Sequence, residues 1–249
     1  MRINNASEEQ PKILKDFIKN LFEKLFKSKI YRNSLPRGTC LANDLVRLNE
    51  GVIKEIWDVG AHHGETSISF ARDYPEAKIQ SFEPISQNYD LLIQNCSHLK
   101  NFRTHKLALG DTNTRTEVFM QNNSVIHSLR DDLNKASSND SVSEIVEVKT
   151  IDYLVKRFLL QNIDLLKIDV EGYEMQVLKG ARESLEEKKI SFIYLETGLD
   201  NRFVPIQSLV EYLEPYGYFP FAFYEQTAHW TGKQNLWYWN TLFVKENLL

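Results

Sequence analysis

Apolar and polar positions along this chain predict strands that alternate with helices. From residue 52, short apolar runs stop at a glycine or an acid, and each is followed by apolar residues at helical spacing. The expected strands lie at 52–60, 77–84, 101–111, 162–172 and 190–198. The expected helices lie at 64–74, 86–96, 151–160, 173–188 and 204–217. This alternation predicts right-handed crossovers and a mainly parallel, doubly wound α/β sheet.

Two regions break the alternation. Residues 114–120 and 142–150 are β-rich and are joined by the polar stretch 121–140. The last two expected strands, 218–224 and 240–246, follow each other without an intervening helix, so they predict an antiparallel hairpin at one edge of the sheet.

The first 50 residues form a helical extension to the expected sheet domain at 51–249. Apolar pairs recur every four residues from Ile13 to Phe26, and six lysines oppose two acids within 12–29. We expect this helix to pack on the main domain or in a homo-oligomer. The alternative is that this helix lies on an anionic membrane surface, at the inner face of the membrane. A second short helix is expected at 40–49.

Composition narrows the class of protein. With 42% apolar residues in 249, wholesale disorder is excluded, and no apolar run is long enough to span a membrane. The N-terminus lacks a secretory pattern, and Cys40 and Cys96 offer neither a disulfide framework nor a metal-binding pair, so we expect a cytoplasmic protein. A formal charge of −4 argues against nucleic acid as the partner.

The turn after the first strand, Asp58 to Gly64, is the first candidate for chemistry. Ligands of doubly wound folds bind at the carboxyl ends of the strands, and Gly60 and Gly64 let the backbone approach a ligand closely. The spacing G-A-H-H-G does not complete the dinucleotide fingerprint. Glu83 ends the second strand, where an acid accepts hydrogen bonds from ribose hydroxyls. Together these features predict a ligand that contains a nucleoside.

Four segments in order carry a family resemblance: Asp58–Gly64, Phe82-Glu83-Pro84, Ala108–Asp111 and Lys167–Gly172. Together they resemble the FkbM-type S-adenosylmethionine-dependent methyltransferases, over about residues 52–200. The resemblance implies a Rossmann-like, seven-stranded, mostly parallel sheet that binds S-adenosylmethionine. It also implies methyl transfer to an oxygen of a small-molecule or glycan acceptor, such as a sugar of a surface glycan or a natural product.

The resemblance also implies the roles of single residues. The first turn and the start of the next helix would hold the methionine part of the cofactor, Glu83 and Pro84 the ribose, and Ala108 and Leu109 the adenine. Asp169 would face the methionine amine or the acceptor. The residues of the turn and helix are Asp58, Gly60, Ala61, His62, Gly64, Glu65 and Thr66.

A sugar hydroxyl needs a base or a metal to take its proton during methyl transfer. Asp169 and Glu171 are two residues apart where the strand ends, so their side chains share one side if strand geometry persists. They are candidates for the general base or for ligands of a divalent metal such as Mg²⁺. Their alternative roles are helix capping and hydrogen bonding to the loop. Glu196 ends the next strand and is expected to contact the acceptor.

Three further residues are candidates outside these motifs. His127, in the polar stretch, has an imidazole suited to general base catalysis. Trp230 and Trp237 could stack on a sugar ring, although tryptophans more often fill cores and interfaces.

Two other functions stay open at this point. They are an NAD(P)-dependent oxidoreductase, which the incomplete glycine fingerprint disfavours, and a non-catalytic nucleoside-binding scaffold.

Overall fold

The computed structural model describes residues 18–19, 21–25, 35–48, 52–120, 142–199, 201–228 and 235–249. Contacts divide the chain into two units, Met1–Thr39 and Cys40–Leu249. In the first unit, residues 18–19 and 21–25 are helical, and Ile18, Leu21 and Leu25 are exposed there. The expected packing of the helix at 12–29 on the main domain or in a homo-oligomer, and its alternative on a membrane surface, stay predictions.

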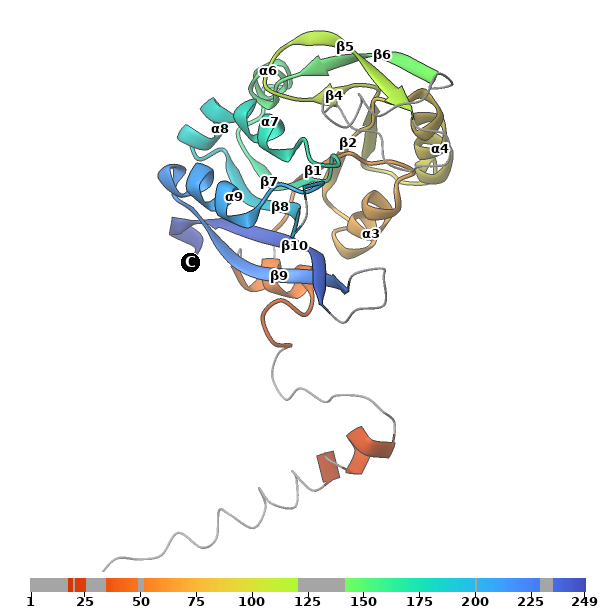
Figure 1. Ribbon diagram of the computed structural model, residues 1–249. Helices are drawn as coiled ribbons and strands as arrows, with labels where there is room; N and C mark the ends of the chain where they lie inside the picture. Colours follow the sequence, from red (N-terminus) through yellow and green to blue (C-terminus); the bar gives the residue numbers. More distant parts are fainter. Residues whose placement is uncertain are drawn as a thin grey trace, which may run out of the picture. The chain divides into compact units, whose positions relative to one another are not determined.

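The second unit is built on a seven-stranded sheet, as expected (Figure 1). Its strands, in the order in which they lie side by side, are β3 (Phe102–His105), β2 (Lys78–Phe82), β1 (Glu55–Val59), β7 (Ile163–Ile168), β8 (Ile190–Gly198), β10 (Leu236–Lys245) and β9 (Tyr218–Ala228). The first five are parallel, and β10 is antiparallel to both β8 and β9. This confirms the doubly wound α/β fold with an antiparallel edge.

Helices cover both faces of the sheet (Figure 1). They are α2 (Leu41–Leu48), α3 (Glu65–Asp73), α4 (Ser86–Cys96), α6 (Ile151–Arg157), α7 (Glu174–Lys179), α8 (Arg182–Glu186) and α9 (Ile206–Leu213), with short 3₁₀ turns η1 (Glu214–Tyr216) and η2 (Glu246–Leu248). Successive strand residues point to opposite faces. Trp57 and Leu166 therefore pack in one core with α6 to α9. Ile56 and Leu165 pack in the other with α2 and α3.

Helix α2 belongs to the sheet-containing unit. Leu45 is fully buried in the core with α3, and the buried Asp44 accepts a hydrogen bond from the hydroxyl of Tyr224 in β9 at 2.9 Å. Among the residues that the structure describes, no helix is both long and apolar enough to cross a membrane.

The prediction of a single strand at 101–111 is wrong, because the chain forms two short strands there. β3 ends at His105, and the amide of Leu107 donates to the His105 carbonyl at 3.0 Å, a tight turn that interrupts the ladder. β4 (Ala108–Leu109) then joins a second sheet in the order β4-β6-β5, with β5 at Thr114–Met120 and β6 at Val142–Lys149.

The C-terminal hairpin is longer than expected. β9 runs to Ala228 and β10 begins at Leu236, so Trp237 is a strand residue rather than part of a loop. β9 forms one edge of the sheet, contains Pro220, and pairs with β10 through several register shifts.

The prediction of a single helix at 173–188 is also wrong, because the chain forms two helices there, α7 and α8. Gly180 lies against the turn after β4, and a Cβ added there would sit 1.9 Å from the Gly110 carbonyl oxygen. The break leaves polar groups that Asp152 satisfies. Its amide donates to the Gly180 carbonyl, and its carboxylate accepts the amides of Glu183 and Ser184 at 2.9 Å each.

We expect Gly180→Ala to lower the free energy of unfolding by about 1–3 kcal/mol, because the new methyl group forces backbone atoms apart. Urea denaturation followed by circular dichroism measures this loss. Lys179→Ala, at the exposed neighbouring position, is the matched control and should change little. Equal midpoints for the two variants would contradict the close approach of Gly180 to Gly110.

Candidate functional site

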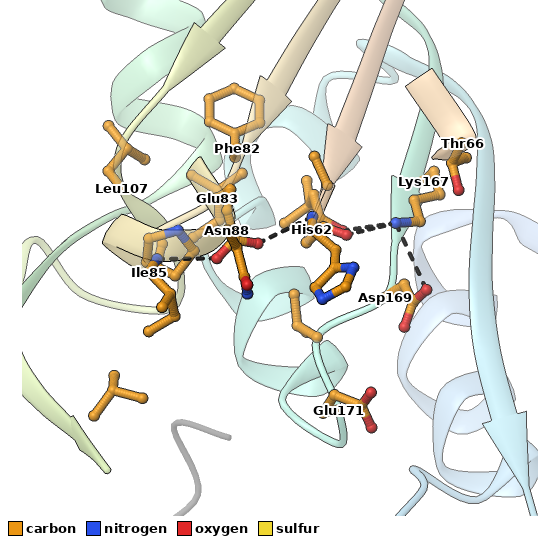
Figure 2. A pocket seen from close by; sticks show the side chains of 18 of the residues that line it. His62, Thr66, Phe82, Glu83, Ile85, Asn88, Leu107, Lys167, Asp169 and Glu171 are labelled. Atoms are coloured by element: carbon orange, nitrogen blue, oxygen red, sulfur yellow. Dashed lines mark hydrogen bonds and ion pairs between the residues drawn. The ribbon is translucent and has the colours of Figure 1, made fainter. Parts of the chain in front are cut away.

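A cavity of about 270 Å³ opens at the carboxyl ends of β1, β2 and β7. Figure 2 shows Glu83 and Asn88 on one side and Asp169 and Glu171 on the other, with His62 between them. Most of the residues expected from the sequence line it: Gly60, Ala61, His62, Glu65, Thr66, Glu83, Pro84, Ala108, Leu109, Asp169 and Glu171.

Gly60 is required by a close approach of two strand ends. Its φ is +74°, and a Cβ added there would lie 1.8 Å from the Asp169 carbonyl oxygen. Gly64 does not line the cavity. Its φ is +94°, and a Cβ there would lie 2.5 Å from the Cys96 sulfur, so packing on α4 explains this glycine.

Asp58 also lies outside the cavity lining, beneath the first turn. Its side chain is fully buried, and Oδ1 lies 2.8 Å from the Nζ of Lys167 on the neighbouring strand β7. Its Oδ2 accepts a hydrogen bond from Ser67 in α3 at 2.6 Å, and the Ser67 hydroxyl lies 2.7 Å from that of Ser81 in β2. The Asp58 carboxylate therefore stabilises the backbone beneath the cavity. It does not line the cavity, where a contact with the methionine part of the cofactor was expected.

Lys167 also lines the cavity, although no role was expected for it from the sequence. Its ammonium also donates to the Gly60 carbonyl at 2.8 Å and lies 3.6 Å from Asp169 Oδ2. Burial disfavours its charge, but Asp58 and Asp169 outweigh burial and raise the pKa of Lys167 to about 12. Its sequence signal is a charge within the apolar run of β7.

Glu83 is a buried acid with its carboxylate in the cavity. Oε2 accepts the amide of His62 at 3.0 Å, and Oε1 accepts the amide of Ile85 at 2.9 Å. Burial raises the pKa of Glu83 to about 7, although these amides and a hydrogen bond from Asn88 oppose the shift. A carboxylate has about four acceptor sites, so these three donors leave room for a ligand hydroxyl.

Apolar side chains form the wall of the cavity beside Glu83. Phe82 and Ile85 come from β2 and the start of α4, and Leu107 and Leu109 from the β3–β4 region. Val118 of β5 completes this wall. The second sheet therefore closes the side of the cavity where a flat apolar ring would fit, a role that the β-rich pattern alone did not reveal.

The turn at 169–172 does not continue the strand, which corrects the expected geometry of its two acids. β7 ends at Ile168, and Glu171 and Gly172 have φ values of +53° and +90°. Glu174 holds this turn, because its Oε1 accepts the amides of Val170 at 3.2 Å and Gly172 at 3.0 Å. Asp169 and Glu171 thus reach the cavity through a turn rather than through strand alternation.

Three acids at or near this turn, Glu171, Glu174 and Glu196, have raised pKa values. Burial and the charge of Asp169 raise the pKa of Glu171 to about 7, against the opposing charges of Arg202 and Lys167. Burial raises the pKa of Glu174 to about 7, and burial with Asp169 and Glu171 raises that of Glu196 as well. Glu196 does not line the cavity itself.

An aromatic cluster lies beyond Glu171. The guanidinium of Arg202 stands over Trp237 at 4.7 Å from the ring centre, and Phe203 stacks on Tyr238 at 5.4 Å. Trp237 is half-buried and does not line the cavity. His127 and Trp230 lie outside the described residues, so their expected roles stay predictions.

All residues that line the cavity fall within a segment that matches one family. Residues 58–220 match the Methyltransferase FkbM domain, which is more than half of the chain. The chain belongs to the FkbM methyltransferase family. The resemblance drawn from the four segments is thereby confirmed.

Curated relatives of this FkbM chain are methyltransferases. It is 29% identical over 156 residues to methyltransferase sdnD of Sordaria araneosa, and 28% identical over 163 residues to the 2-O-methyltransferase NoeI of Sinorhizobium fredii. The matches cover 51% and 61% of this chain, and 60% and 66% of those relatives. It is also 24% identical over 147 residues to the hexuronic acid methyltransferase AglP of Haloferax volcanii, covering 58% and 57% of the two chains.

The fold of the FkbM domain also has a solved counterpart. A crystal structure of an FkbM methyltransferase from Methylobacillus flagellatus matches with a TM-score of 0.51 at 17% identity, covering 77% of this chain and 43% of that chain. A likeness at this identity shows the shared fold.

The FkbM site does not gather the expected carboxylates into a set of three ligand atoms. In the described part of the chain, the residues whose metal-binding atoms lie within 4.8 Å of one another in a group of three are His62, His63 and Glu65. Asp169, Glu171 and Glu196 form no such group there, so the expected Mg²⁺ site at these acids stays a prediction.

We expect Lys167→Met in this FkbM chain to lower the free energy of unfolding by about 3–5 kcal/mol, because it leaves Asp58 buried without its partner. Urea denaturation measures the loss. Arg182→Met breaks the exposed pair of Arg182 with Glu186 and should leave the midpoint almost unchanged. Adding Asp58→Asn to Lys167→Met should recover part of the loss. A Lys167→Met midpoint equal to that of Arg182→Met would contradict the buried pair.

Proposed function

We propose that this chain transfers a methyl group from S-adenosylmethionine to a hydroxyl group of a sugar or glycan acceptor. The observation that carries the proposal is Glu83. It places a buried carboxylate in a cavity at the carboxyl ends of the strands, beside an apolar wall. A nucleoside is the ligand that needs both an acceptor for two ribose hydroxyls and a flat apolar slot.

The residues present fit this cofactor. Glu83 would hold a ribose hydroxyl with the acceptor site that His62, Ile85 and Asn88 leave unused. The wall of Leu107, Leu109 and Val118 would take the adenine. At the other end, Asp169 offers a carboxylate oxygen to the methionine ammonium, and Gly60 leaves room for the backbone of Asp169.

S-adenosylmethionine supplies an electrophilic methyl group on a sulfonium. The chain must then align an acceptor oxygen with that methyl group and take the proton of the hydroxyl. Glu171 is our candidate base, because it lines the cavity and its pKa near 7 suits proton transfer at neutral pH. Asp169 is kept beside Lys167 at 3.6 Å, so we assign it to the cofactor side.

The acceptor class rests on two supports. The relatives NoeI and AglP are, by name, a 2-O-methyltransferase and a hexuronic acid methyltransferase. In this chain, the charge of Arg202 lowers the pKa of Glu171, and Arg202 lies over the half-buried Trp237, so we assign contacts with a sugar acceptor to this pair. The oxidoreductase alternative lacks the complete glycine fingerprint, and family membership favours methyl transfer over it.

Calorimetry with S-adenosylmethionine and S-adenosylhomocysteine tests the cofactor. We expect both to bind, and Glu83→Ala to weaken binding by about tenfold or more, because the charge-assisted hydrogen bond to the ribose is lost. Asp73→Ala, on the exposed end of α3, is the control and should bind like the unaltered chain. If neither compound binds, or NADH binds in their place, the proposal is wrong.

The pH dependence of methyl transfer tests Glu171. With a panel of methyl glycosides and hexuronic acids as acceptors, and with S-adenosylmethionine at saturating concentration so that the titration of Glu83 does not limit the rate, we expect the initial rate to rise with pH and level off above about 7, as Glu171 loses its proton. Glu171→Asp should keep a rise of this kind at a lower rate, and Glu171→Gln should remove it. An unchanged profile in Glu171→Gln, with S-adenosylhomocysteine still bound, would reject Glu171 and leave the cofactor assignment standing.

A further inference from the structure

Three metal-ligating side chains meet at the start of α3. The Nδ1 of His62 lies 4.0 Å from one carboxylate oxygen of Glu65, and the Nδ1 of His63 lies 3.9 Å from the other. The two imidazoles are stacked, with ring centres 3.6 Å apart. All three ligand atoms lie within 4.8 Å of one another, and no described carboxylate cluster in the cavity equals this arrangement.

The backbone that carries these side chains is fixed from both sides. The amide of His62 donates to Glu83, and the carbonyl of His63 accepts a hydrogen bond from Asn95 in α4 at 2.9 Å. His62 has a φ of +48°, and Gly64 follows in the left-handed region. Glu65 is the first residue of α3. The three ligands therefore start from a rigid turn, which lowers the cost of ordering them around an ion.

The donor set selects the kind of ion. Imidazole nitrogens suit Zn²⁺, Cu²⁺, Ni²⁺ and Co²⁺, whereas Mg²⁺ and Ca²⁺ prefer oxygen ligands. Bonds of about 2.0–2.2 Å around a tetrahedral ion put its ligand atoms roughly 3.3–3.5 Å apart. The present separations of 3.9 and 4.0 Å between the histidine nitrogens and the Glu65 oxygens shorten to that value when the side chains rotate slightly. Such rotations are open to the Glu65 side chain, which is 73% exposed, and to the two histidines, which are about one third exposed.

We propose that His62, His63 and Glu65 bind one divalent transition-metal ion of the Zn²⁺ class, with the remaining coordination position open. His62 and Glu65 line the cavity, so the ion stands at its rim. The site is separate from the acids at 169–171, and its occupancy does not depend on the proposed methyl transfer.

The experiment titrates Zn²⁺ and Co²⁺ into the full chain, prepared without a polyhistidine tag. Zn²⁺ binding is followed by calorimetry, and Co²⁺ binding by its visible absorption. We expect one ion per chain for each metal, and no saturable heat with Mg²⁺. His63→Ala and Glu65→Gln should each weaken binding by about tenfold or more, since even partners that only orient a ligand contribute about that much.

His98→Ala removes an exposed histidine outside the cluster and should leave metal affinity unchanged. Circular dichroism checks that each variant is folded, and the exposed Glu65 provides a test even if His63→Ala does not fold. Absence of saturable Zn²⁺ and Co²⁺ binding would overturn the proposal. So would binding that both variants leave at the affinity of the unaltered chain.

Discussion

The site depends on the ion pair between Lys167 and Asp58, which lies under the end of the parallel sheet. Both side chains are almost fully buried, at 6% and 0% exposure, so each charge has lost the solvation that water would give it. Such a pair is stable only where further hydrogen bonds satisfy both partners. Here Ser67 bonds to the carboxylate, and the Gly60 carbonyl accepts from the ammonium. The network joins β1, β7 and α3 at the point where the chain must leave the sheet.

Acidic groups lie on both sides of the cavity above this pair. Toward β2, Glu83 lies beside the apolar wall, and burial raises its pKa to about 7. On the other side, burial and the charge of Asp169 raise the pKa of Glu171 and of Glu174 to about 7, and they raise the pKa of Glu196 as well. Lys167 keeps its charge among these acids, because Asp58 and Asp169 raise its pKa. The cavity therefore holds acids that change charge near neutral pH around a cation that does not.

The sequence predicted the strand–helix order and most cavity residues, because strand ends meet at one edge of a parallel sheet wherever the helices lie. It failed where tertiary contacts override local pattern. The helix break at Gly180 follows from contact with Gly110, which is 70 residues away in the chain. Gly64 is explained by Cys96 rather than by a ligand. Lys167 was visible as a charge in an apolar strand, but its partner became clear only from the pairing of β1 with β7.

The far edge of the sheet carries a different consequence. An exposed edge strand of 11 residues offers a template onto which another chain could add a strand, and long, flat edges of this kind promote aggregation. Pro220 removes one donor from β9, the register with β10 shifts along its length, and Glu225 bends the backbone with a φ of +50°. These interruptions leave no long, regular row of backbone groups with which another strand could pair. These features disfavour the addition of a further strand at this edge of the sheet.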